Sequence, residues 1–109
     1  MMSARRRILP ILLAMSMGAS LLAGCAGLEE NATGEEIYNA RCASCHRKDL
    51  GGGLGPPLGP GSSAADRPLE YYEVTLNTGM GRMPSFESSL SAEQKQRVID
   101  YVISVQAEG

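Results

Sequence analysis

Two cysteines and a histidine stand within five consecutive positions, in the order Cys42-Ala43-Ser44-Cys45-His46. On a helical turn, residues three apart point the same way, so both thiols can reach one bound group. The adjacent histidine presents a ring nitrogen close by. C-x-x-C-H is the attachment motif for haem of the c type, in which the thiols add to the two vinyl groups and the histidine binds the iron. The motif predicts one covalent haem c held by Cys42, Cys45 and His46.

Three other interpretations of this motif fit less well. A tetrahedral zinc site needs four Cys or His ligands. The chain has one histidine and three cysteines, and the third cysteine, Cys25, is expected to carry a lipid. A thioredoxin-like dithiol needs a βαβ setting, which the helical patterns of the chain do not provide. A disulfide between Cys42 and Cys45 suits an exported protein, but it leaves the adjacent His46 unexplained.

The amino terminus has the pattern of an export signal. Arg5, Arg6 and Arg7 precede an apolar run over residues 8–22, which is shorter than the roughly 20 residues of a membrane-spanning helix. The run ends in Leu22-Ala23-Gly24-Cys25, which resembles the lipobox of bacterial lipoproteins. That resemblance implies cleavage before Cys25 and acylation of this cysteine. The alternatives are an ordinary leader, or an uncleaved anchor with Cys25 incidental.

On the lipoprotein interpretation the chain divides into three parts. Residues 1–24 are a removed signal peptide, residues 25–32 are a lipidated tether of at most about 28 Å, and residues 33–109 form one domain. The protein then lies in the bacterial cell envelope, facing the periplasm and held by its acyl chains. Ala26 follows the cysteine where an inner-membrane retention signal would place Asp, which weakly favours the outer membrane.

Composition supports a small domain built around a prosthetic group. The 109 residues contain one Phe, four Tyr and no Trp, but 13 Gly and 6 Pro. A chain of this size and composition has too few large apolar side chains for a core of its own. Its net charge is −2, and all twelve acidic residues follow the leader with its three arginines. This balance excludes nucleic-acid binding through a basic surface.

Three segments have helical patterns. The first begins at Thr33, the second runs from about Pro68 to Asn77, and the third begins at Ser91. The first and third have capping boxes, in which Glu36 is the expected partner of Thr33 and Gln94 that of Ser91. For the second helix, Asp66 is the expected N-cap and Gly79 the expected stop.

The stretch over residues 50–61 is rich in glycine and proline, so it is neither a regular helix nor a central strand. It reads as a flexible linker or as an ordered loop around a ligand. The ordered loop is favoured, because a compact domain rarely keeps a long idle loop. Leu54 and Leu58 are its expected packing residues.

Residues 33–106 resemble a small bacterial class I cytochrome c. The resemblance is carried by the C-x-x-C-H motif and by Gly34 and Tyr38, which stand eight and four positions before Cys42. Val98 and Tyr101 match the apolar and aromatic positions of the family's last helix. The resemblance implies an all-α fold of about three to four helices wrapped around one covalently bound haem.

Gly55-Pro56-Pro57-Leu58 resembles the family's loop after the motif. The resemblance implies that the Pro56 carbonyl accepts a hydrogen bond from the ligand histidine, and that Leu58 contacts the haem ring. A carbonyl in that place orients the imidazole and raises its basicity.

The sixth iron ligand is to be chosen between Met80 and Met83. Only Met83 precedes a proline, which biases its backbone toward an extended form, and Met-Pro is the ligand signature of the family that the chain resembles. Met83 is the expected axial ligand opposite His46, with Met80 as neighbouring packing.

An iron with two protein ligands has no position for a substrate. The sequence therefore predicts a membrane-anchored mono-haem electron carrier that cycles between Fe(III) and Fe(II), not an enzyme. Expected partners are membrane oxidoreductases or other cytochromes, with no nucleic acid and no small-molecule substrate. The alternatives are a fixed electron-transfer subunit of a larger oxidoreductase and, less favoured, a ligand-binding or peroxidase-like haem protein.

Overall fold

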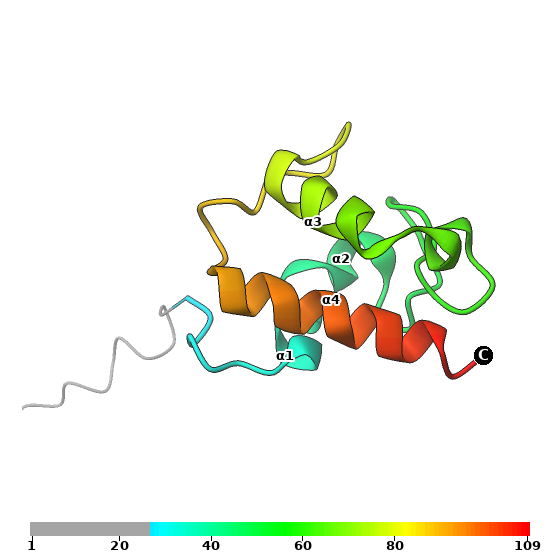
Figure 1. Ribbon diagram of the computed structural model, residues 1–109, viewed down its shortest axis with the longest axis horizontal. Helices are drawn as coiled ribbons and strands as arrows, with labels where there is room; N and C mark the ends of the chain where they lie inside the picture. The colour runs from blue at the N-terminus through cyan, green and yellow to red at the C-terminus, as the bar shows by residue number, and fades with distance from the viewer. Residues whose placement is uncertain (1–26) are drawn as a thin grey trace, which may run out of the picture.

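The computed structural model describes residues 27–109. Within them the fold is all-α, without strands, as predicted (Figure 1). The elements in chain order are α1 (Gly34–Arg41), α2 (Ala43–His46), the short 3-10 helix η2 (Ser63–Asp66), α3 (Leu69–Thr78) and α4 (Ala92–Gln106). None of the helices in this part of the chain has the length and apolar character needed to span a membrane.

The longest helix, α4, begins where its sequence predicts. The Ser91 hydroxyl accepts from the Gln94 N–H at 3.1 Å, and the Gln94 side chain accepts from the Ser91 N–H at 2.9 Å. This reciprocal pair satisfies two donors that the first helical turn leaves free. At α1 only half of the expected box forms. The Thr33 hydroxyl accepts from the Glu36 N–H, while the Glu36 carboxylate bonds that hydroxyl and not the backbone.

The predicted cap of α3 is wrong. Asp66 lies at the end of η2, and Pro68 is the N-cap of α3, with no side-chain bond to the helix. A proline restricts the residue before it to extended backbone, and Arg67 accordingly has φ −85° and ψ 147°. The chain therefore cannot continue from Asp66 into the helix, which begins at Leu69 and stops, as predicted, at Gly79.

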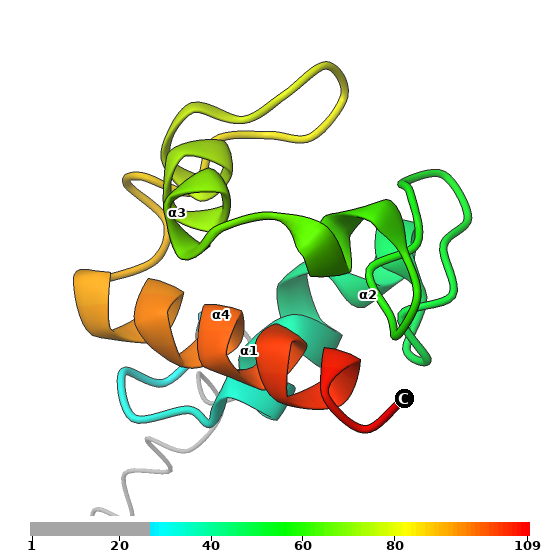
Figure 2. The same cartoon turned by 45° about the vertical axis from the view of Figure 1, so that its right-hand side comes forward.

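Helices α1 and α4 pack across each other (Figure 2), and Gly34 lies where they meet. A Cβ atom on Gly34 would lie 2.2 Å from the carbonyl oxygen of Arg97, so no larger residue fits this crossing. Beside it, the rings of Tyr38 and Tyr101 lie 5.6 Å apart, centroid to centroid. The buried side chains around this crossing, chiefly Ile37, Tyr38, Val98, Ile99 and Val102, form the core.

The segment before α1 is fastened to α4. The Gln94 amide donates to the Glu29 carbonyl at 3.0 Å, and the Arg97 guanidinium donates to the carbonyls of Ala32, at 2.9 Å, and Glu30. The Ser91 hydroxyl donates to the Glu30 carboxylate at 2.7 Å. Residues 29–32, part of the tether expected at 25–32, thus lie against the helical domain, on the side of α4 away from α3 (Figure 1).

The glycine- and proline-rich loop is ordered around Leu50. This side chain is 1% exposed, and its carbonyl accepts from the N–H groups of Leu58 and Gly59. Leu58 packs against the core, as expected. Leu54 does not pack against the core: its side chain is 83% exposed, and it lines the large cavity described below. The Gly53 N–H donates to the Gly55 carbonyl, and this tight turn places Leu54 at a tip of the loop.

Candidate haem-binding site

A large, mainly apolar cavity of about 590 Å³ lies between the helices and the two loops that follow α2 and α3. A volume of this order suits a cofactor or a drug-sized ligand. All the sequence-predicted site residues in the described part of the chain line it: Cys42, Cys45, His46, Pro56, Leu58 and Met83. Cys25, the predicted lipidation site, lies outside the described residues.

The cysteine pair is held by the junction of α1 and α2. Cys42 ends the first helix and caps the second: its N–H donates to the Tyr38 carbonyl, and its carbonyl accepts from the N–H groups of Cys45 and His46. Residues 42–46 therefore make one helical turn beside the cavity. Both thiols are free, with Cys42 half-buried and Cys45 exposed. Burial, together with the nearby Cys45 thiol, raises the pKa of Cys42 to about 11.

The histidine ring is fixed from one side. His46 is 8% exposed, and its Nδ1 atom lies 2.8 Å from the Pro56 carbonyl oxygen. A carbonyl only accepts, so in the neutral ring Nδ1 carries the proton and Nε2 holds the free lone pair. That arrangement leaves Nε2 available as a metal ligand.

Gly55 also helps to hold this ring, a role that the sequence alone did not predict. A Cβ atom on Gly55 would lie 2.9 Å from Cε1 and 3.0 Å from Nδ1 of His46. The loop therefore approaches the imidazole face more closely than any other residue type allows. The only signal in the sequence is a glycine directly before Pro56, in a stretch that holds several other glycines.

A tight turn carries the two methionines. Met80 and Met83 exchange both backbone hydrogen bonds, at 3.0 and 2.9 Å, with Gly81 between them at φ +57°. Gly79, at φ +71°, precedes the turn, and a Cβ there would lie 2.6 Å from the Met83 carbonyl. Both methionines line the cavity. Met83 is half-buried and packs on the core, whereas Met80 is 57% exposed.

The charged side chains that line the cavity are all basic. Arg41, Arg67 and Arg82 contribute to its wall, and no carboxylate of the described residues does. The Arg67 guanidinium lies 5.0 Å from the centre of the Tyr71 ring, within cation–π range. Anionic groups on a ligand are therefore favoured here.

A second tyrosine joins three distant segments at the cavity. The Tyr72 hydroxyl, on α3, donates to the Ala64 carbonyl in η2. The Gln106 amide, on α4, donates to the Tyr72 oxygen and to the Leu58 carbonyl, each at 2.9 Å. This network holds the loop that carries Pro56 against the last turn of α4. Nothing in the residue spacing predicted it, because its members are 34 and 48 positions apart.

The cavity fits a covalently bound haem. It combines apolar walls for a flat macrocycle, two thiols on one helical turn, an imidazole with a free Nε2, and a thioether sulfur on a separate loop. Its arginines match the two carboxylates that haem carries. By contrast, no three His, Cys, Asp or Glu side chains gather into a metal cluster anywhere in residues 27–109.

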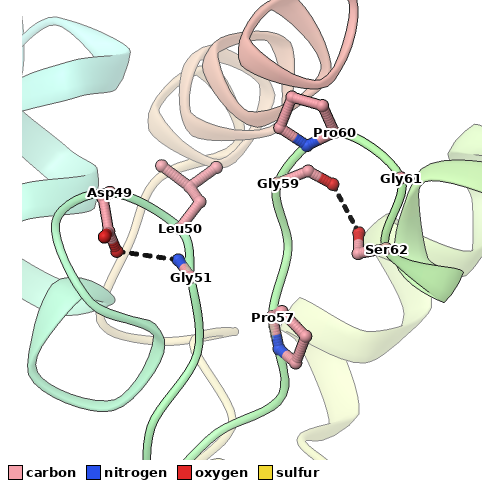
Figure 3. Close-up of a pocket in the computed structure, with 8 residues that line it drawn as sticks. All are labelled: Asp49, Leu50, Gly51, Pro57, Gly59, Pro60, Gly61 and Ser62. Carbon is pink, nitrogen blue, oxygen red and sulfur yellow. Dashed lines mark hydrogen bonds between the residues drawn. The ribbon is translucent and has the colours of Figure 1, made fainter. Parts of the chain in front are cut away.

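A separate hollow of about 330 Å³ lies in the loop after α2 (Figure 3). Its two polar side chains bond to the loop itself. The Asp49 carboxylate accepts from the Gly51 N–H at 2.8 Å, and the Ser62 hydroxyl donates to the Gly59 carbonyl at 2.6 Å. Both polar side chains of this hollow are thus used to shape the loop. The larger cavity is therefore the candidate functional site.

The family of "Cytochrome C oxidase, cbb3-type, subunit III" matches residues 29–102. This range is most of the chain and includes α1, α2, α3 and most of α4. The chain belongs to this cytochrome family. Cytochrome c6 of Leptolyngbya boryana is 32% identical over 83 residues, which cover 72% of this chain and 95% of that protein. No solved structure matches the chain.

Membership of the family agrees with the fold and the cavity. The chain contains a mono-haem class I cytochrome c domain with covalent haem c, and it is an electron carrier, not an enzyme. The family also implies redox proteins as partners and a periplasmic or membrane-associated location.

Proposed function

We propose that this cytochrome is a membrane-anchored, mono-haem electron carrier whose haem is linked to Cys42 and Cys45 and whose iron is bound by His46 and Met83. When bound, the haem supplies the Fe(III)/Fe(II) couple. The main support is the 2.8 Å contact between His46 Nδ1 and the Pro56 carbonyl, in a cavity that also holds both thiols and a thioether. With two protein ligands, the iron has no position open to a substrate, which suits electron transfer with little rearrangement.

Burial supports Met83 over Met80 as the axial ligand. A ligand sulfur must lie among the apolar groups of the cavity, and Met83 is the methionine that packs on the core. The Met80 side chain is largely in solvent. The following Pro84 and the hydrogen-bonded turn from Met80 to Met83 restrict the loop, so little conformational freedom is lost when the sulfur binds.

Two residues of the loop after α2 complete the proposed site. The Pro56 carbonyl orients the imidazole and, by accepting a hydrogen bond from its Nδ1–H, raises the basicity of the ligand nitrogen. Leu58 lines the cavity and packs against the core, so its side chain suits contact with the ring of the macrocycle.

The proposed anchor rests on the lipobox-like end of the leader. Residues 1–24 are the removed signal peptide, Cys25 is the acylated residue, and residues 33–109 are the haem domain. Residues 29–32 are already bound to α4. Only the stretch from Cys25 to Glu29 then joins the lipid to the domain, and its four Cα–Cα steps span at most about 15 Å. The haem domain would lie close to the membrane surface, in the cell envelope facing the periplasm.

One experiment tests the main elements together. The full chain is expressed with a haem-attachment system, extracted from membranes, and measured by absorption and by intact mass. We expect a low-spin spectrum with the ferric methionine charge-transfer band, and a mass that includes one haem and the acyl chains on Cys25. A soluble, unacylated product contradicts the anchor. Rapid carbon monoxide binding to the native ferrous protein contradicts the two-ligand site and supports a ligand-binding haem.

A fixed subunit of a larger oxidoreductase is the second candidate. The observation that favours it is the family description itself, which names an oxidase subunit. Gentle detergent extraction followed by affinity purification distinguishes the two. A free carrier elutes alone, whereas a fixed subunit elutes with a catalytic chain in constant ratio.

A further inference from the structure

The backbone turns abruptly directly after His46. Arg47, the C-cap of α2, has φ +67° and ψ 154°. Only glycine adopts this region readily, because a Cβ atom crowds the neighbouring peptide there. The chain nonetheless places an arginine at this position, so surrounding contacts must hold the strained turn.

The strongest of these contacts comes from the middle of α1. The hydroxyl of Tyr38 donates a hydrogen bond of 2.6 Å to the carbonyl oxygen of Arg47. The Tyr38 ring is fully buried and packs against Tyr101, so this donor cannot swing away. The Leu50 N–H donates to the same carbonyl at 3.0 Å. The carbonyl next to the histidine thus has two donors, one from a separate helix.

This carbonyl is linked closely to the orientation of His46. The His46 carbonyl accepts from the Gly52 N–H at 2.9 Å, and the Gly55 N–H donates to the Cys45 carbonyl at 2.9 Å. Both bonds fold the loop back so that Pro56 reaches the imidazole. A different orientation of the Arg47 peptide would send the loop elsewhere and break the bond between Pro56 and His46.

We propose that the Tyr38 hydroxyl is a positioning group for the axial histidine. The hydroxyl holds the Arg47 carbonyl and so maintains the strained turn. This turn keeps the Pro56 carbonyl hydrogen-bonded to His46 Nδ1. The proposal rests on the proposed function, in which His46 binds the haem iron. It assigns to Tyr38 a role beyond the packing of its ring between α1 and α4.

The test compares Tyr38→Phe with the wild type in the full, haem-loaded chain. The substitution keeps the ring and removes one hydroxyl. We expect exchange of the His46 Nδ1 proton with solvent, followed by NMR in the ferrous protein, to become about tenfold faster or more, since a held hydrogen bond protects such a proton. We also expect a higher reduction potential, because a less basic histidine stabilises Fe(III) less. Tyr101→Phe is the matched control: it removes the hydroxyl of the facing ring and leaves the bond from Tyr38 to Arg47 in place.

A second substitution separates positioning from general stability. Arg47→Gly relieves the strain, so in that background Tyr38→Phe should change the potential and the proton exchange much less. This difference is the coupling that a double-mutant cycle measures. Equal effects in both backgrounds, or no effect of Tyr38→Phe on either property, overturn the proposal.

The outcome remains decisive if Tyr38→Phe fails to mature. Recovery of a haem-loaded protein by adding Arg47→Gly supports the proposal. Failure of both, with a normal Tyr101→Phe protein, overturns it, because the hydroxyl then serves the whole fold. The proposed function is tested separately, on the wild-type protein before any variant is made. A wild-type ferric spectrum without histidine–methionine ligation contradicts the proposed function itself.

Discussion

The Nδ1 atom of His46 lies 2.8 Å from the carbonyl oxygen of Pro56, although ten positions of irregular chain separate the two residues. This contact fixes the imidazole while leaving its other nitrogen free. It depends on a loop backbone that passes directly over the ring at Gly55.

Gly55→Ala should disturb this contact. The added methyl carbon would lie 2.9 Å from Cε1 of His46, so either the ring or the loop must shift. We expect a loss of about 1–3 kcal/mol in the free energy of unfolding, the usual cost of overpacking, together with a change in reduction potential. Gly53→Ala is the control, because its methyl has no neighbour closer than 3.4 Å. Equal behaviour of the two variants in denaturant titrations would disprove the close approach.

Met83→Ala should abolish the charge-transfer band between methionine and ferric iron. Met80→Ala should retain it, because the Met80 side chain is mostly in solvent while Met83 packs on the core. Near-infrared absorption of the ferric proteins measures the band directly. The reverse pattern would assign the ligand to Met80.

Arg97→Ala should release the segment before α1. Its guanidinium donates to the carbonyls of Ala32 and Glu30, and a charged donor contributes about 1.5–3 kcal/mol when both partners are held. We expect the Ala32 amide, which bonds to the Glu29 carbonyl, to exchange about tenfold faster or more in hydrogen-exchange NMR. Gln96→Ala, on the exposed face of the same helix, should leave that amide unchanged. Unchanged exchange in Arg97→Ala would show that the segment is held by other contacts.

Titration of Tyr38 should lower the free energy of unfolding in alkaline solution. Burial raises the pKa of Tyr38 above its ordinary value of 10.0, so the folded protein favours the protonated phenol. The protonated phenol contributes fully to the free energy of unfolding below pH 10. This contribution is lost as the pH rises toward the folded-state pKa of Tyr38, by at most about 1.4 kcal/mol per pH unit. The difference in unfolding free energy between wild type and Tyr38→Phe should therefore narrow between about pH 9 and 11. A constant difference over that range contradicts the raised pKa.

Local signals were the most predictable part of the fold. The capping box of Ser91 and Gln94 and the stop at Gly79 involve residues within a few positions of each other, so sequence spacing specifies them. The failures arose where a neighbouring residue changed the local rule. Pro68 displaced the cap expected at Asp66, and the turn from Gly53 to Gly55 holds Leu54 at the cavity wall and not on the core.

The part of the site that the C-x-x-C-H motif specifies was predictable from the sequence. The turn over residues 42–46 and its place beside a cavity follow from the C-x-x-C-H pattern. The bond from Tyr38 to Arg47 does not, because its acceptor is a backbone carbonyl whose direction depends on an unusual φ. The close approach of Gly55 to His46 likewise depends on the path of the whole loop, which residue types alone do not specify.

The bonds from Gln106 to Leu58 and Tyr72 also have a consequence for the order of assembly. The helical turn that carries both cysteines and the histidine forms from neighbouring residues, whereas the loop beside it is secured by partners 48 positions away. Contacts so distant in sequence form late in folding, because the intervening chain must first be ordered. We therefore expect the two thiols to be accessible before α4 docks and the cavity closes, which leaves an interval in which a large planar group can enter and be joined to the chain.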